Sequence, residues 1–376
     1  MTERLLFEFA GEKFSLISRD GVNLNEVILY LTPAFRIINV ATPVTCTINL
    51  YVRKFVQTWV DENRPWRMPP VLNVDLDGNG GGLRIVKYSD EEKIIYREPE
   101  KDSVGALIEV NQCNRTWNIT ISEDGHLNDK TFSRIIKQLV GYCTYKKKAQ
   151  VLHASCVIIK DTSYVFFGPR GSGKSSFLLR CCTDLNADFK SDDLLICWSE
   201  GNDVQLSGWP RRMGISLSSL DSSVVGTIKP FSLRRKQPLE DNWLNDIGQH
   251  YPPNSRKRIL FDVDEFMQTF NTNYSDFTGR IVFLMLNFVN EENILRLTHL
   301  NGVDDHNIFT NPNQERHFVD YLNLAPSPLV PGVKHTFTEL SSHNNLFQLS
   351  YGPNIFSDFR KTWQLIEQEI KRHAAS

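Results

Sequence analysis

One stretch, VFFGPRGSGKSS at residues 165–176, constrains the fold of this chain more than any other. The apolar run at residues 164–167 predicts a buried strand, and a glycine-rich loop connects it to a helical stretch at residues 174–182. The loop matches the pattern G-x-x-x-x-G-K-[ST], in which glycines let backbone N–H groups surround phosphate oxygens at a helix N-terminus. The stretch therefore predicts a phosphate-binding loop between a strand and a helix.

The loop and the first helical turn form the predicted nucleotide site. Lys174 would reach the β- and γ-phosphates, and the Ser175 hydroxyl would ligate the Mg²⁺ that bridges them. The expected cofactors are ATP and Mg²⁺. The predicted nucleotide contacts are Gly168, Pro169, Arg170, Gly171, Ser172, Gly173, Lys174, Ser175 and Ser176.

Two adjacent carboxylates, Asp192 and Asp193, supply the next part of a phosphoryl-transfer site. They follow Lys174 by eighteen and nineteen residues, the length of one helix and a turn, so the chain can return to the phosphate end of the sheet. One carboxylate can hold Mg²⁺, directly or through water, and the other can accept a proton from an attacking hydroxyl. Adjacent carboxylates divide such roles according to their environments.

His153 precedes Gly168 by fifteen residues. Together with the loop GPRGSGKS and the sequence SDD after one helix, this spacing resembles the HPr kinase/phosphorylase family and the HPr-kinase-like seryl kinases. The resemblance covers residues 152–199. It implies that Lys174 and the loop bind the triphosphate, that Ser175 and Asp192 hold Mg²⁺, and that Asp193 is the base toward the substrate serine. It also implies that His153 lies beside the acids and influences their protonation.

The chain departs from this family in two places. Residues 210–215, PRRMGI, match the end of a later family signature, but Trp209 occupies the place of its metal-binding glutamate. The reverse, phosphorylase reaction is therefore not expected, and HPr need not be the substrate. The front half shows no kinship with the family's usual N-terminal domain. Similar two-part proteins occur beside genes for ribosomally made peptides, which implies a peptide substrate.

The chain of 376 residues is long enough for two domains. Residues 1–148 alternate strand-like stretches with polar breaks, and helices are predicted at residues 24–31 and 128–148. This pattern predicts a smaller α+β domain, a candidate for substrate recognition. Residues 149–376 are predicted to form an α/β P-loop kinase domain with a mixed twisted sheet, which the resemblance makes similar to HPr kinase and phosphoenolpyruvate carboxykinase.

Several elements are expected around the loop. A strand at residues 151–160 should form an antiparallel hairpin with the loop-bearing strand, because only a short turn separates them. Further strands are expected within residues 256–261, directly after the cations Arg256, Lys257 and Arg258, and at residues 280–286. Helices are expected at residues 314–324 and at 357–373, the latter with Ser357 as its N-cap. DLDGNGGG, at residues 75–82, is expected to be a hairpin tip rather than a cation-binding loop.

Composition excludes several other classes. The net charge is −2 and the sequence pI is about 6.5, so broad binding to nucleic acid or anionic membranes is not indicated. The longest apolar runs are shorter than the ~18–20 residues of a membrane helix, and the N-terminus lacks the features of a signal peptide. A cytoplasmic location is expected. The seven cysteines, without C-x-x-C spacing, suggest buried reduced thiols rather than zinc ligands.

Three functions remain in competition. The first is an ATP- and Mg²⁺-dependent kinase for a serine or threonine hydroxyl of a peptide or small protein, with homo-oligomerisation left open. The second is a kinase for a small hydroxyl compound such as free serine or a sugar, and the third is a non-catalytic nucleotide-binding regulator. A cation is expected to contact the transferring phosphoryl group. The candidates are Arg211, Arg212, Arg256, Lys257 and Arg258.

Overall fold

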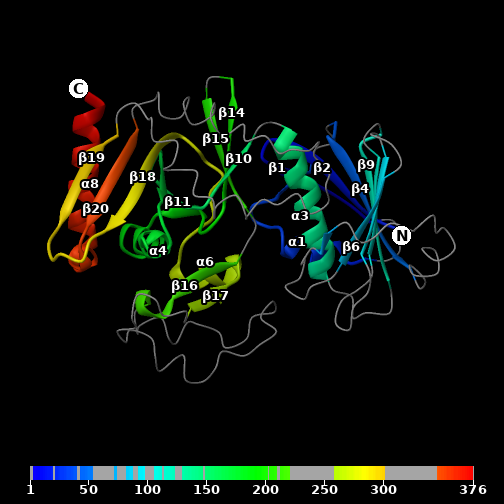
Figure 1. Ribbon diagram of the computed structural model, residues 1–376, viewed down its shortest axis with the longest axis horizontal. Helices are drawn as coiled ribbons and strands as arrows, with labels where there is room; N and C mark the ends of the chain where they lie inside the picture. The colour runs from blue at the N-terminus through cyan, green and yellow to red at the C-terminus, as the bar shows by residue number, and fades with distance from the viewer. Residues whose placement is uncertain are drawn as a thin grey trace. The chain divides into compact units, whose positions relative to one another are not determined.

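The computed structural model shows a mixed α/β protein (Figure 1). The described residues up to 146 form one compact unit, and those from 149 onward form another. The structure describes residues 3–19, 22–39, 43–53, 72–73, 82–87, 92–97, 106–111, 114–122, 129–146, 149–201, 203–209, 212–220, 258–300 and 345–375.

The first unit contains a nine-stranded mixed sheet in the order β3-β1-β2-β4-β9-β8-β7-β6-β5. β4 pairs parallel with both β2 and β9, and the other pairs are antiparallel. The strands are β1 (Glu3–Phe9), β2 (Glu12–Ser18), β3 (Arg36–Ile37), β4 (Cys46–Arg53), β5 (Leu72–Asn73), β6 (Gly82–Lys87), β7 (Glu92–Arg97), β8 (Ala106–Asn111) and β9 (Thr116–Ser122). This part of the chain therefore combines a mixed sheet with helices.

Two helices complete this unit, α1 (Leu24–Leu29) and α3 (Asp129–Lys146), close to their predicted positions. The Ser133 hydroxyl of α3 donates to the Val27 carbonyl of α1 at 2.9 Å, which ties the two helices together. Strands β5 and β6 pair antiparallel on either side of the predicted hairpin tip. Gly82, the last residue of that stretch, begins β6, and residues 75–81 lie outside the described residues.

The second unit is organised around a six-stranded mixed sheet in the order β13-β11-β12-β18-β20-β19. β12, β18 and β20 run parallel, and the other pairs are antiparallel. The strands are β11 (Ala154–Ile159), β12 (Thr162–Phe167), β13 (Asp188–Ser191), β18 (Arg280–Phe288), β19 (Leu295–His299) and β20 (Leu346–Tyr351). The expected hairpin of β11 and β12 is confirmed.

The strand expected at residues 151–160 is broken at His153. β10 (Gln150–Leu152) pairs with β14 (Leu195–Glu200), which in turn pairs with β15 (Asp203–Gly208) in a three-stranded sheet. β11 belongs instead to the six-stranded sheet. The prediction of one continuous strand was wrong, because the chain passes from one sheet to the other at His153.

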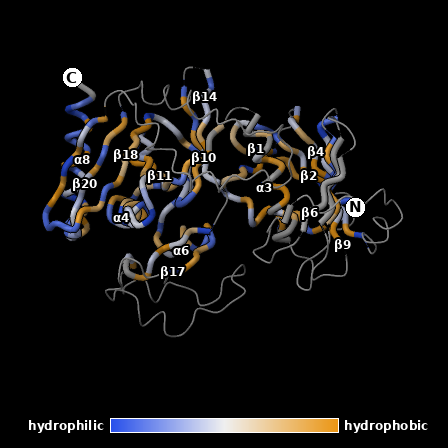
Figure 2. The backbone as a smooth tube through the Cα atoms, viewed as in Figure 1, coloured by the Kyte–Doolittle hydropathy of each residue, from blue (hydrophilic) through white to orange (hydrophobic). Residues whose placement is uncertain are grey.

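Alternation along β12 gives the six-stranded sheet two apolar faces. Tyr164 and Phe166 join the cluster under α4 (Lys174–Leu185) and α8 (Phe359–Ala375), whereas Val165 and Phe167 join the cluster that includes β14. Figure 2 shows β18 as largely apolar and α8 as mostly hydrophilic. α8 therefore buries one stripe, formed by Phe359, Trp363, Ile366 and Ile370, as its spacing predicts.

The start of α8 differs from the expectation. The backbone N–H of Lys361 donates to Asp358 Oδ1 at 3.2 Å, so Asp358 caps the helix. Ser357 instead follows the short helix η4 (Pro353–Phe356), and its hydroxyl donates to the Asn354 carbonyl at 2.7 Å. The expected N-cap at Ser357 was wrong by one residue.

A small two-stranded sheet and a helix contribute buried residues to the same core as α4 and α8. β16 (Met213–Ser216), followed by the single turn η1 (Leu217–Ser219), pairs with β17 (Arg258–Phe261), which leads into α6 (Val263–Phe270). α6 begins with a capping box between Asp262 and Glu265. The helix expected at residues 314–324 lies outside the described residues.

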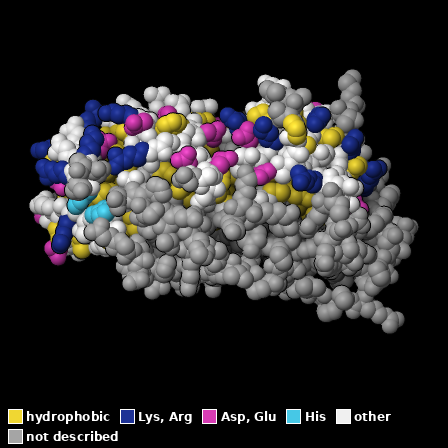
Figure 3. All heavy atoms as spheres, turned by 90° about the horizontal axis from the view of Figure 1, so that it is seen from above, with side chains coloured by type: hydrophobic (Ala, Val, Ile, Leu, Met, Phe, Trp, Pro, Cys, Tyr) yellow, Lys and Arg dark blue, Asp and Glu magenta, His cyan; other side chains and the backbone are white. Residues whose placement is uncertain are grey.

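The surface charge and the helices bear on the classes of protein that the composition disfavours. The face shown in Figure 3 carries both basic and acidic side chains. Among the described helices, none combines the length and the apolar character needed to cross a membrane.

Candidate functional site

The predicted phosphate-binding loop lies between the carboxyl end of β12 and the first turn of α4, which confirms the predicted strand–loop–helix order. Gly168, Gly171 and Gly173 have φ values of +142°, +83° and +83°, a region that L side chains rarely adopt. A Cβ on Gly168 would lie 2.8 Å from the Leu286 carbonyl oxygen. The loop conformation therefore depends on the glycines that define the motif.

Lys174 is buried at the start of α4. Its Nζ donates to the carbonyl oxygens of Gly168 and Pro169 at 2.9 and 3.1 Å. Burial lowers the pKa of Lys174, and the nearby carboxylates of Asp193 and Asp192 oppose this effect. The amine is thus held across the loop by two of the loop's own carbonyls, and a protonated lysine has three N–H donors in all.

Asp192 is only 8% exposed and lies next to the loop helix. Its Oδ2 accepts from the Gly214 backbone N–H at 3.0 Å, and its Oδ1 from the Ser155 hydroxyl at 3.4 Å. Burial raises the pKa of Asp192 to about 7, with a smaller contribution from Asp193, while a hydrogen bond from Ser175 lowers it. The structure thus brings together Ser175 and Asp192, the two predicted Mg²⁺ ligands.

His153 and Asp193 form a second contact in the same site. His153 Nε2 and Asp193 Oδ1 are 2.9 Å apart, with side chains 24% and 28% exposed. The strand pairing explains this contact: His153 lies between β10 and β11, and Asp193 lies between their partners β14 and β13. The two junctions must therefore face each other.

The donor set fits Mg²⁺. A hydroxyl and a carboxylate are hard oxygen ligands, and Mg²⁺ usually combines one or two protein carboxylates with waters and substrate phosphates. Within the described part of the chain, no group of three or more His, Cys, Asp or Glu residues forms a metal site made of protein alone. Ser175 and Asp192 would therefore hold the ion jointly with a nucleotide.

Residues 210–215, which resemble the end of the later family signature, contribute one contact to the candidate site. Gly214, in the part that matches, donates its N–H to Asp192. Trp209, which replaces the glutamate, is adjacent to the acid pair in space because its N–H donates to the Leu194 carbonyl at 3.0 Å. Gly214 is thus part of the candidate site, and the backbone of Trp209 bonds to the residue that follows the acid pair.

Two of the five cations predicted to contact the transferring phosphoryl group, Arg212 and Arg258, are among the described residues. Arg212 Nε forms an ion pair with Asp262 Oδ1 at 3.0 Å, and the Arg258 side chain runs past Gly214. Arg211, Arg256 and Lys257 lie outside the described residues. Arg212 thus pairs with the residue that caps α6, and Arg258 lies beside the glycine whose N–H donates to Asp192.

Two contacts of the site had no signal in the sequence. Ser155, which bonds to Asp192, is an ordinary strand residue two positions after His153. Tyr351, at the end of β20, donates its hydroxyl to the Ser172 carbonyl at 2.8 Å across 179 residues of sequence. Only the strand order brings these groups to the loop and the acids.

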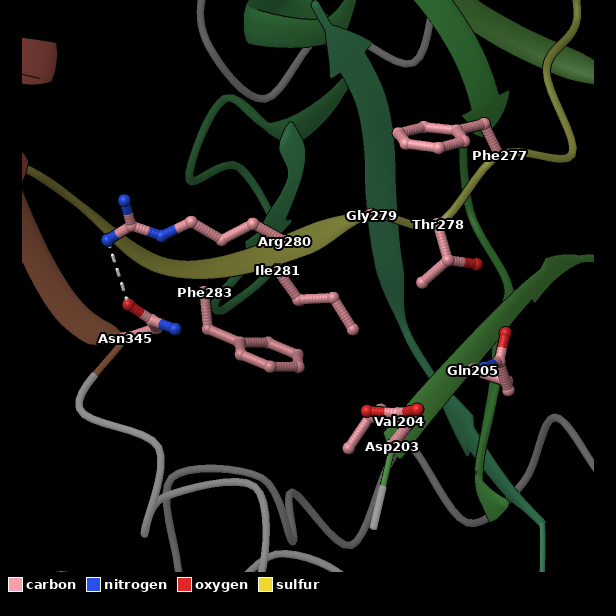
Figure 4. Close-up of a pocket in the computed structure, with 10 residues that line it drawn as sticks. All are labelled: Asp203, Val204, Gln205, Phe277, Thr278, Gly279, Arg280, Ile281, Phe283 and Asn345. Carbon is pink, nitrogen blue, oxygen red and sulfur yellow. Dashed lines mark hydrogen bonds between the residues drawn. The ribbon is translucent and has the colours of Figure 1, made fainter. Parts of the chain in front are cut away.

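A hollow of about 480 Å³ lies elsewhere, at the amino ends of β18 and β15 (Figure 4). Ile281 and Phe283 point into it, while Arg280 extends toward Asn345, to which it donates at 3.1 Å. Arg280 is paired with the first residue of β12, so the hollow is at the opposite end of that strand from the loop. It does not belong to the candidate site at the loop.

Comparison with models of known protein families and with curated proteins gives no match for this chain.

Proposed function

We propose that this protein is an ATP- and Mg²⁺-dependent kinase that phosphorylates a serine or threonine hydroxyl of a peptide or small protein. The observation that carries the proposal is the convergence of three pairs in one site. Lys174 lies on the loop carbonyls, Ser175 bonds to Asp192, and His153 bonds to Asp193. A loop that only holds a nucleotide does not require the last pair.

The two carboxylates have different environments and therefore different proposed roles. Asp192 is buried and accepts hydrogen bonds from Gly214, Ser155 and Ser175, which fixes it beside the predicted metal position. Asp193 is more exposed, and the His153 side chain forms an ion pair with it. A base must reach the proton that it removes, so Asp193 is the better candidate.

The proposed reaction follows from these positions. Asp193 accepts the proton of the acceptor hydroxyl as its oxygen forms a bond to the γ-phosphorus, and the bond from that phosphorus to the β-phosphate oxygen breaks to release ADP. Lys174 and the loop amides hold the phosphates in line with the acceptor. Bound Mg²⁺ would supply positive charge to the phosphate oxygens. His153 keeps the Asp193 carboxylate directed at the acceptor.

The acceptor class rests on the resemblance of residues 152–199 to HPr-kinase-like seryl kinases. For a peptide acceptor, we assign substrate recognition to the first unit, whose nine-stranded sheet would bind part of the peptide outside the catalytic site. In this proposal the second unit transfers the phosphoryl group and the first unit selects the peptide.

The test is transfer from γ-labelled ATP with Mg²⁺ to serine-containing peptides and to a panel of small hydroxyl compounds. The control is Lys174→Ala, with exposed Lys361→Ala on α8 as the matched variant. Label on a peptide, lost only in Lys174→Ala, supports the proposal. Label on a small compound would replace the substrate class. Tight ATP binding without any labelled acceptor would contradict the kinase proposal and favour a non-catalytic nucleotide-binding regulator.

A further inference from the structure

Tyr351 is buried at the carboxyl end of β20, the same edge of the sheet at which β12 leads into the phosphate-binding loop. This follows from the parallel direction of β12, β18 and β20. The Tyr351 carbonyl accepts from the Val289 N–H at 2.9 Å, and the ring packs edge-on against Phe177 of α4, with centroids 5.1 Å apart. Both backbone and ring are therefore held in place.

The hydroxyl of Tyr351 acts on one peptide unit of the loop. It donates to the Ser172 carbonyl oxygen at 2.8 Å. The Ser172 carbonyl and the Gly173 N–H belong to one planar trans peptide and point in opposite directions. Anchoring the carbonyl on Tyr351 therefore directs the Gly173 N–H away from β20. In a loop of this pattern, that amide is one of those that meet phosphate oxygens.

The space around this contact is filled. A Cβ on Gly173 would lie 2.2 Å from the Tyr351 hydroxyl oxygen, and Gly173 also has a φ of +83°. Glycine is thus required at position 173 for its backbone conformation and to admit the tyrosine. Burial raises the pKa of Tyr351 well above its usual value, so the hydroxyl keeps its proton and remains a donor at neutral pH.

We infer that Tyr351 is a positioning residue for nucleotide binding: its hydroxyl sets the orientation of the peptide between Ser172 and Gly173. This inference rests on the proposed function, since it assigns a task within the same site. Tyr351 does not touch the reacting atoms. Its effect reaches the nucleotide through the loop, so it should change ATP affinity more than turnover.

The experiment compares Tyr351→Phe with the wild-type full chain. The variant keeps the ring and loses only the hydrogen bond. We expect the Kd for Mg²⁺-ATP, measured by titration calorimetry, to rise about five- to tenfold, the effect of losing one hydrogen bond. KM for ATP should rise with it, while kcat changes less. The matched control is Tyr164→Phe, which removes another largely buried hydroxyl, bonded to Glu367 at 3.3 Å.

The outcomes separate this inference from the proposed function. If wild type binds ATP and Tyr351→Phe binds equally well, Tyr351 has no positioning role. If both tyrosine variants weaken binding alike, the effect is general destabilisation and the inference is also wrong. If wild type binds no nucleotide, the proposed function fails. In that case, amide hydrogen exchange without ligand tests whether Tyr351 orders the loop. If Tyr351→Phe leaves the exchange rates of residues 168–176 unchanged, the inference is wrong.

Discussion

His153 Nε2 lies 2.9 Å from Asp193 Oδ1, although the two residues are forty positions apart in the chain. Each lies at a junction where the chain leaves one sheet and enters the other, and the antiparallel partners of the two strands place these junctions face to face. The proposed base is thus oriented by the crossing of two sheets, which gives it a rigid support.

Asp193→Asn is expected to keep ATP binding and to lower kcat by about 10²- to 10⁴-fold, the usual contribution of a general base. The amide has nearly the same shape and cannot accept the proton. Steady-state transfer from labelled ATP, together with calorimetric ATP binding, measures both effects. Exposed Asp203→Asn on β15 is the matched control. Full turnover in Asp193→Asn would show that the base is another group.

His153→Ala is expected to lower kcat by about tenfold while leaving the Kd for ATP unchanged, because it removes a group that orients the proposed base and leaves the loop intact. His153→Gln, which retains a donor near the same position, should recover part of the rate. Steady-state kinetics with saturating ATP checks this. A loss of ATP affinity equal to the loss of kcat would place His153 in the nucleotide site instead.

Stability should depend on pH through Asp192. Burial raises the pKa of this carboxyl from 3.8 to about 7, so the folded protein keeps a proton that the unfolded chain loses near pH 4. In the metal-free protein, the free energy of unfolding should therefore fall as the pH rises across this window, by at most about 1.4 kcal/mol per pH unit.

Asp192→Asn removes the titrating group and should remove this part of the pH dependence. Urea unfolding of both proteins at several pH values between about 5 and 7 measures the two slopes. Identical slopes in the wild type and in Asp192→Asn would contradict the assignment of the raised pKa to this residue.

Trp363→Ala should destabilise the second unit strongly. Its side chain is 2% exposed and packs edge-on against Tyr164 and Phe166, with centroids 4.9 and 6.1 Å apart. Truncating a buried aromatic residue costs about 3–5 kcal/mol. Leu365→Ala, two positions further on α8 at a site 45% exposed, should cost far less. Denaturant unfolding compares the two, and equal losses would mean that α8 does not pack as described.

Local patterns in the sequence predicted the elements that depend on nearby residues. The glycines and lysine of residues 168–175 specify the strand–loop–helix unit because backbone φ values and helix amides are local properties. Apolar spacing located α3 and α8, and the short turn between β11 and β12 predicted their antiparallel pairing. The proximity of Ser175 and Asp192 was also foreseen from their short separation in the chain, which α4, a turn and β13 occupy.

The tertiary structure alone decided the contacts between distant strands. Strand pairing bends the chain at His153, which residue types at 151–160 do not signal, since both sides of the break are equally apolar. The same pairing brings Ser155 and the Gly214 amide to Asp192, and strand order brings Tyr351 to Ser172. Such contacts depend on which strands become neighbours, and that choice is made by burial over the whole core rather than by any local pattern.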